Sequence, residues 1–183
     1  MAEAEIPTGK ETKTPQADGA APAGESQAAR TGQPPGEEID RYSVGVTWAG
    51  DAMGCGEVRV ADGSFVVPIG GSKELGGCGK GANPEELLLA AVGACFVNTW
   101  AIFLQKLKVS YAEPAVRMGG TLGRDPAGGY KMSAMTIHAL VPAALLAGGR
   151  ENVEKTLALA EKYCIISKVA KAAMPVTVVV EEV

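Results

Sequence analysis

The sequence predicts an α+β domain with a mostly antiparallel sheet, in the element order βββ–α–ββ–α(α)–β. Short runs that alternate apolar and polar residues occur in two groups, one on each side of a long apolar segment. That segment, from Leu87 to Leu104, carries no charged residue. A later stretch repeats apolar residues at helical spacing, and a β-branched run follows Pro175. Segregated strands and helices of this kind are typical of α+β proteins rather than of doubly wound ones.

Residues 1–40 have the composition of a disordered tail. They are rich in Ala, Gly, Pro, Glu, Thr and Gln, and their large apolar residues are Met1, Ile6 and Ile39. The segment also contains acidic residues throughout, which does not fit an acid-poor organelle transit peptide. We therefore predict a solvated tail over 1–40 and one folded domain over 41–183.

Composition excludes some classes of function. The net charge of −4, with 46% hydrophobic and 21% charged residues, is ordinary for a soluble chain and argues against a nucleic-acid partner. The N-terminus has no secretory apolar region, so we expect a cytoplasmic protein with reduced thiols. One histidine and four widely spaced cysteines predict no metal site, and Gly79-Lys80-Gly81 fails the phosphate-loop pattern, so no cofactor is expected.

Three strands are predicted before the long helix. Alternation predicts a half-buried strand over 44–48 and another over 58–60, and Asp62-Gly63 marks a tight turn into a third strand over 64–69. A Gly-rich connection, interpreted as a flexible surface loop, follows over 70–82. Cys55 and Cys78 lie in Gly-rich segments, where incidental surface thiols are favoured, although a disulfide between them remains open.

The long helix has a well-defined start signal. Asn83 can cap it, Pro84 suits the first helical position, and Glu85 and Glu86 favour the positive end of the helix dipole. Its uncharged stretch reaches the lower limit for a membrane span. The stretch is only thinly apolar, so we predict instead the central helix of a soluble core, buried on every face. The residues that reduce the hydrophobicity of this stretch are Gly93, Asn98, Thr99 and the alanines at 90, 91, 94 and 101.

The second half of the chain predicts strands over 111–122 and 130–141, joined by a turn over 123–129. In the second strand an apolar face alternates with a polar one that carries His138, which we interpret as exposed and without a catalytic role. A helix opening near Gly149 then places Cys164 on its apolar side, and it continues or restarts before Pro175 and a closing strand over 176–180. The apolar face of the strand comprises Met135, Ile137, Ala139 and Val141, and that of the helix Val153, Leu157, Ala160 and Cys164.

Cys95 in the long helix and Cys164 at the end of the later helix would meet if the two helices pack together. Such a pair can act as an attacking and a resolving thiol toward a hydroperoxide O–O bond, because the second thiol condenses with the sulfenic acid before over-oxidation. On the residues alone, inert core packing of both cysteines remains the alternative.

Three motifs resemble the OsmC/Ohr family of thiol-dependent hydroperoxide reductases: Asn83-Pro84-Glu85-Glu86-Leu87-Leu88, Ala94-Cys95-Phe96 and Cys164-Ile165-Ile166-Ser167. The resemblance extends from about 43 to 183. It implies a two-layer fold with the sheet packed on the central helix, in an intertwined homodimer with sites at the subunit interface. It also implies reduction of organic, including lipid-derived, hydroperoxides to alcohols.

The resemblance further implies roles for individual residues. Cys95 would be the peroxidatic cysteine, Cys164 the resolving cysteine, and Glu85 the carboxylate that orients an activating arginine. A dithiol would re-reduce the disulfide, and a lipoylated protein is one candidate for this partner. The competing function is a non-catalytic binding protein of the same fold, with an apolar ligand beside an unreactive Cys95.

The chain departs from the family pattern at two places. Ile165 stands where the family usually has proline, and residues 50–56 contain no activating arginine, so Arg59 is the nearest candidate. Burial alone would raise the pKa of Cys95, and about 15 Å of straight helix separates it from Glu85. We therefore expect a break at Gly93 or a contribution from a partner subunit. A straight, isolated helix without an arginine near Cys95 would argue against peroxidase activity.

Overall fold

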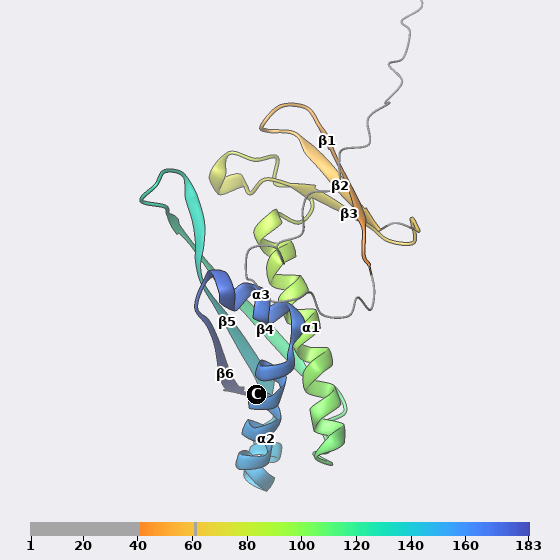
Figure 1. The fold of residues 1–183 in the computed structure, drawn as a ribbon, viewed down its shortest axis with the longest axis vertical. Helices are drawn as coiled ribbons and strands as arrows, with labels where there is room; N and C mark the ends of the chain where they lie inside the picture. The colour runs from red at the N-terminus through yellow and green to blue at the C-terminus, as the bar shows by residue number, and fades with distance from the viewer. Residues whose placement is uncertain (1–40, 61) are drawn as a thin grey trace, which may run out of the picture. The chain divides into compact units, whose positions relative to one another are not determined.

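The computed structural model describes residues 41–60 and 62–183, and Ser43–Val183 forms one compact unit. The tail predicted over 1–40 lies outside the described residues. The elements follow the predicted order (Figure 1). They are β1 (Val44–Ala49), β2 (Cys55–Val60), β3 (Val66–Gly70), the short 3₁₀ helix η2 (Lys73–Leu75), α1 (Pro84–Lys106), β4 (Ala115–Arg124), β5 (Tyr130–Val141), α2 (Ala143–Tyr163), α3 (Ile165–Ala173) and β6 (Val176–Glu182).

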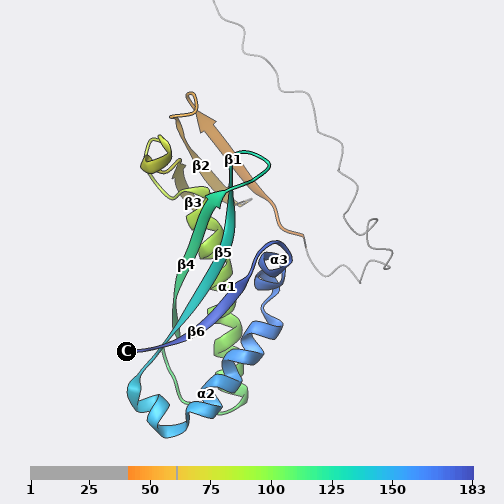
Figure 2. The same ribbon diagram turned by 90° about the vertical axis from the view of Figure 1, so that its left-hand side faces the viewer.

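The strands form two three-stranded sheets, in the orders β1-β2-β3 and β4-β5-β6. The pairs β1–β2, β2–β3 and β4–β5 are antiparallel, and β5–β6 is parallel. The predicted α+β class with a mostly antiparallel sheet is therefore confirmed. In the second sheet the strands form one layer and α1, α2 and α3 pack on it as the other (Figure 2).

The first sheet differs from the prediction in its burial. The expected turn is present, because the Asp62 carboxylate accepts hydrogen bonds from the backbone and the hydroxyl of Ser64. However, all six residues of β1 are exposed, and the apolar side chains of Val46 and Trp48 are 61% and 46% exposed. The prediction of a half-buried β1 is wrong for a single chain, because alternation reports only that one face is apolar and not what covers it.

The connection over 71–83 is more constrained than the predicted flexible loop. It contains η2, and the backbone N–H of Gly79 donates to the carbonyl of Gly71 at 3.0 Å. Cys78 in this loop forms a disulfide with Cys55 at the start of β2, with 6.3 Å between the two Cα atoms. The two cysteines are therefore not the incidental surface thiols that the sequence favoured. A disulfide is unexpected in a reducing compartment, and the cytoplasmic location stays a prediction.

Helix α1 begins as predicted, with a complete capping box between Asn83 and Glu86. It runs without a break past Gly93, so the first of the two expected alternatives is absent, and the contribution of a partner subunit stays a prediction. A Cβ at position 93 would lie 2.8 Å from Cγ of Met118, and the glycine thus allows close packing on β4 instead. By length and composition alone α1 could cross a membrane, like many core helices.

Burial along α1 is one-sided. The side chains of Val92, Phe96, Trp100 and Leu104, four residues apart, form the buried stripe, whereas Ile102 is 42% exposed. The prediction of burial on every face is wrong within one chain, because the sheet and the two C-terminal helices cover a single side of α1.

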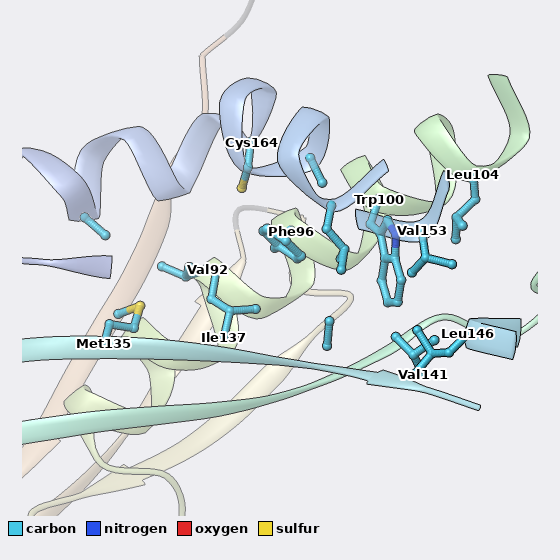
Figure 3. Close-up of a cluster of buried hydrophobic side chains, with 14 residues drawn as sticks. Val92, Phe96, Trp100, Leu104, Met135, Ile137, Val141, Leu146, Val153 and Cys164 are labelled. Atoms are coloured by element: carbon cyan, nitrogen blue, oxygen red, sulfur yellow. The ribbon is translucent and has the colours of Figure 1, made fainter. Parts of the chain in front are cut away.

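The core lies between the α1 stripe, the inner face of β5 and helix α2 (Figure 3). Both predicted apolar faces are confirmed, because all eight of their residues are buried. Helix α2 begins at Ala143, earlier than the predicted Gly149, where its backbone departs from helical geometry. The chain then turns at Cys164 and restarts as α3, as the sequence allowed.

Candidate thiol site

Cys95 and Cys164 are the free cysteines of the chain, and each is held by a helix. Cys95 lies in the middle of α1, next in sequence to the buried Phe96, and is half-buried beside the core. Helix α1 contacts both α2 and α3. The thiol of Cys95 is therefore carried on the side of α1 that approaches the C-terminal helices.

Cys164 occupies the junction between α2 and α3. Its backbone N–H ends α2 by donating to the carbonyl of Ala160 at 2.8 Å, and its extended backbone caps α3. Its sulfur accepts a hydrogen bond from the backbone N–H of Ser167 at 3.4 Å. The residue is fully buried, and its sulfur points toward α1 on the side of Phe96 (Figure 3).

The two thiols are close enough for each to shift the pKa of the other, and the thiol of Cys164 favours a thiolate at Cys95. The packing that places them together is fixed one turn further along α1. There the indole N–H of Trp100 donates to the hydroxyl of Thr156 on α2 at 2.8 Å, fully buried.

The pKa of Cys95 is lowered below the ordinary cysteine value. Burial opposes ionisation, but the backbone N–H groups of Ile166 and Ile165 and the thiol of Cys164 outweigh it. Thr99, whose hydroxyl donates to the carbonyl of Cys95 at 2.8 Å, adds the smallest effect. The two amides belong to the first turn of α3, where they have no partner within the helix. The positive end of α3 thus favours a thiolate at Cys95.

The pKa of Cys164 is raised. Burial is the main cause, the hydrogen bonds from Ser167 oppose it, and the neighbouring sulfur of Cys95 raises the pKa further. A lowered pKa is expected of a thiol that attacks as a thiolate, and a raised pKa of one that stays neutral until a later step. The pKa shifts of Cys95 and Cys164 follow this pattern.

The structure does not bring Glu85 to the two thiols. Glu85 lies in the first turn of the unbroken α1, about 15 Å from Cys95 at 1.5 Å per residue. It lines a cavity of about 280 Å³ together with side chains from η2, α1, β4 and β5. Its lining combines the apolar side chains of Leu75, Leu89, Leu122 and Met132 with the polar ones of Glu74, Glu85, Glu86 and Asn83.

An arginine was expected to activate Cys95, and the described part of the chain supplies none. Arg59 is on β2 and pairs with Glu57 at 2.5 Å. Arg117 and His138 form an ion-pair cluster with Glu181 on the second sheet, with His138 Nδ1 at 3.1 Å from the carboxylate. None of the described residues that lower the pKa of Cys95 is an arginine.

Sequence reasoning missed two contributors to the site. One is the first turn of α3, and the other is Ser167, whose side chain is fully buried beside Cys164. Among the described residues, its hydroxyl oxygen has no hydrogen-bond partner, although its proximity to Cys164 lowers the pKa of that thiol. The signal was available in the spacing, because a residue three after an N-cap faces the capping side chain. The described His, Cys, Asp and Glu side chains form no group of three or more that could hold a metal ion.

Fold and site together define a class: an α+β domain with a pair of unlike thiols between its central helix and the start of a C-terminal helix. Comparison with known proteins agrees. The family described as OsmC-like protein matches residues 77–179, and the chain belongs to this family.

Relatives and solved structures carry related names. The chain is 34% identical over 105 residues to organic hydroperoxide resistance protein-like 1 of Staphylococcus epidermidis. The aligned region covers 57% of this chain and 73% of the relative. The fold of this chain is similar to that of an organic hydroperoxide resistance protein OsmC from Legionella pneumophila, with a TM-score of 0.64 and 24% identity. The superposition covers 78% of this chain and 99% of the Legionella chain. The fold is also similar to that of OhrB of Bacillus subtilis, with a TM-score of 0.57, 21% identity and coverage of 76% and 98%.

Proposed function

We propose that this protein is a thiol-dependent peroxidase that reduces organic hydroperoxides, including lipid-derived ones, to alcohols. The observation that carries the proposal is the contact between Cys95, with a lowered pKa, and Cys164, with a raised one. The names of the Staphylococcus epidermidis and Bacillus subtilis proteins, which refer to organic hydroperoxide resistance, support the substrate class.

The reaction has two balanced steps. The thiolate of Cys95 attacks the distal oxygen of the hydroperoxide, an S–O bond forms, the O–O bond breaks, and the alkoxide leaves and takes a proton to become the alcohol. The thiol of Cys164 then loses its proton and attacks the sulfenic acid of Cys95, which forms the disulfide and releases water. A dithiol, for which a lipoylated protein is one candidate, returns both cysteines to thiols by disulfide exchange.

A homodimer is part of the proposal. Two apolar surfaces support it: the exposed β1 face, with Val46 and Trp48, and the uncovered side of α1, with Ile102. A second copy of the chain would bury both, and sedimentation equilibrium of the purified protein tests this. In this arrangement Glu85 would act with groups of the partner subunit rather than with Cys95 of its own chain. We also place the reaction in the cytoplasm.

Thiol counting with one equivalent of cumene hydroperoxide tests the activity. Because Cys55 and Cys78 are joined, the protein has two free thiols, and we expect both to disappear with release of cumyl alcohol. In Cys95→Ser no thiol should be lost, and in Cys164→Ser a sulfenic acid should accumulate and react with dimedone. Unchanged thiols in the wild-type protein would refute the proposal.

The second candidate is a non-catalytic binding protein for a small apolar ligand. The cavity of about 280 Å³, whose lining includes Leu75, Leu89, Leu122 and Met132 beside polar groups, favours it. The same titration separates the two functions, because a binding protein would retain both thiols and release no alcohol. Isothermal titration calorimetry with saturated and hydroxylated fatty-chain ligands would then detect binding in the absence of any reaction.

A further inference from the structure

Cys95 and Cys164 differ in how easily a molecule from solution reaches them. Cys164 is 0% exposed, and its own chain covers it completely. Cys95 is half-buried and borders an open strip of α1, because Ala91, Ala94 and Asn98 are exposed. These three residues lie on the same side of the helix as Cys95, four and one positions before it and three after it. A thiol from solution therefore reaches the sulfur of Cys95 and not that of Cys164.

A second copy of the chain would not reverse this order. It could cover more of Cys95 but would not uncover Cys164, because Cys164 is buried in the core of its own chain. The hydroperoxide of the proposed function must also reach Cys95, so a path to that sulfur stays open in the dimer. The dithiol that restores the two thiols can use the same path.

Cys164 has hydrogen-bond donors in place for a negative charge. The backbone N–H of Ser167 donates to its sulfur at 3.4 Å. The side chain of Ser167 is also 0% exposed, and its hydroxyl has no hydrogen-bond partner among the described residues. A buried hydroxyl without a partner costs stability, and a neutral thiol is only a weak acceptor. A thiolate at Cys164 is the state in which this hydroxyl gains a strong acceptor.

We propose that Ser167 receives the thiolate of Cys164 when a dithiol attacks the disulfide between Cys95 and Cys164 at the sulfur of Cys95. This inference rests on the proposed function and deepens it, since it names the sulfur that the reductant attacks and the group that stabilises the one that leaves. The hydroxyl of Ser167 then donates to the leaving sulfur beside the backbone N–H.

The exchange has two balanced steps. A thiolate of the dithiol forms an S–S bond with Cys95, the bond between Cys95 and Cys164 breaks, and Cys164 leaves with the electron pair and then takes a proton. The second thiol of the dithiol loses its proton and attacks the dithiol's own sulfur in the mixed disulfide, which releases Cys95 as a thiolate. Ser167 also lowers the pKa of Cys164, and a thiol of lower pKa leaves faster.

The first experiment locates the mixed disulfide in the full-length wild-type protein. Diamide joins Cys95 to Cys164, and 2-mercaptoethanol then reacts for a few seconds before an acid quench. Alkylation with N-ethylmaleimide in denaturant and peptide mass spectrometry show which cysteine carries the mercaptoethanol, and the peptides of Cys55 and Cys78 are evaluated separately. We expect the adduct on Cys95 and the alkylated thiol on Cys164. An adduct on Cys164 would overturn the proposal, and so would a pair of thiols that diamide does not join.

The second experiment measures how fast dihydrolipoamide reduces the diamide-oxidised protein, by counting thiols after rapid quenching. Ser167→Ala should react about tenfold more slowly, because the leaving thiolate loses a hydrogen bond to a charged group. Ser167→Thr keeps the hydroxyl and should restore the rate. Ser110→Ala removes an exposed hydroxyl in the loop after α1 and should match the wild type. Equal rates in Ser167→Ala and the wild type would overturn the proposal.

A merely structural role of Ser167 would slow both steps of the exchange alike. The second step is isolated in Cys164→Ser, with mercaptoethanol attached to Cys95 and dihydrolipoamide added to remove it. Adding Ser167→Ala should leave the rate of this removal unchanged, because Cys164 takes no part in it. A loss of the same size in both steps would overturn the proposal. Circular dichroism and melting of the variants show whether α3 is preserved.

None of these readouts requires a peroxide, so this inference and the proposed function can fail separately. An adduct on Cys95 and a reduction rate that depends on Ser167, with thiols that cumene hydroperoxide leaves unchanged, would retain the direction of exchange and remove the peroxidase. Loss of both thiols to the peroxide, with the adduct on Cys164, would do the reverse.

Discussion

The indole N–H of Trp100 and the hydroxyl of Thr156 form a fully buried hydrogen bond of 2.8 Å that joins α1 to α2. The same hydroxyl donates to the carbonyl of Val153 at 2.6 Å, so it is oriented by its own helix. Cys95 lies five residues before Trp100 and Cys164 eight residues after Thr156. This bond therefore sets the spacing of the two helices close to the thiol pair.

Thr156→Val should destabilise the protein, because it keeps the shape of the side chain and leaves the indole N–H buried without an acceptor. The expected loss in the free energy of unfolding is about 1–3 kcal/mol, measured by urea denaturation. Thr156→Ser retains the hydroxyl and should lose clearly less. A larger loss in Thr156→Ser than in Thr156→Val would show that the methyl group, and not the hydrogen bond, is what matters.

Gly93→Ala should also be destabilising, although alanine is the better helix former. The new Cβ would lie 2.8 Å from Cγ of Met118, so α1 and β4 must separate or Met118 must change rotamer. We expect a loss of about 1–3 kcal/mol by chemical denaturation. Gly148→Ala in α2 is the control, because nothing lies within 4 Å of its Cβ. That variant should be neutral or more stable by up to about 1 kcal/mol.

The Cys55–Cys78 disulfide closes a loop across 23 residues. Replacing both cysteines by serine should lower the free energy of unfolding by about 3 kcal/mol through the entropy of the unfolded chain. Differential scanning calorimetry with and without a phosphine reductant measures it. The reductant should lower the melting temperature of the wild type and leave that of the double variant unchanged. If complete reduction of the disulfide left the melting temperature of the wild type unchanged, the disulfide would not stabilise the fold.

Ser167→Ala should slow the resolving step and spare the attack. The buried hydroxyl beside Cys164 lowers the pKa of that thiol, so its removal leaves the neutral form more favoured. Rapid-quench trapping with dimedone should show a longer-lived sulfenic acid at Cys95, with an unchanged rate of its formation. Ser167→Thr, which keeps the hydroxyl, is the comparison. A slower formation of the sulfenic acid would instead place Ser167 in the first step.

The pH profile of the first step follows from the lowered pKa of Cys95. Its rate of oxidation should rise with pH as the thiolate forms, and should level off below the ordinary cysteine pKa of 9.0. Stopped-flow tryptophan fluorescence with cumene hydroperoxide measures this profile. A rate still rising past pH 9 would contradict a lowered pKa.

Individual elements show how much of the fold could be predicted from the sequence. The alternation over 130–141 predicted β5 to the residue, because one of its faces is buried inside the same chain. The equally clear alternation in β1 predicted a strand but not its exposure. Asn83-Pro84 located the start of α1. Of the two alternatives expected for that helix, the break at Gly93 is absent, because that glycine allows packing against Met118 rather than bending.

The candidate thiol site was likewise predicted only in part. Sequence alone identified Cys95 and Cys164 as the pair to examine, and placed Glu85 at the start of the long helix. It could not show that Cys55 and Cys78 meet, because they lie far apart in the sequence and come together only when the loop folds onto β2. It also could not supply the donors to Cys95, because backbone amides carry no side-chain signature.

By itself the sequence determined the order of the elements and most of their apolar faces, and it singled out the two cysteines proposed to react, since periodicity, caps and motifs are local properties of the chain. Only the tertiary structure decided that the start of α3 faces Cys95, that the two thiols have opposite pKa shifts, and that Glu85 stays apart from them. The physical reason is that a pKa and a contact depend on which groups meet in space, and those groups come from helices sixty and more residues apart.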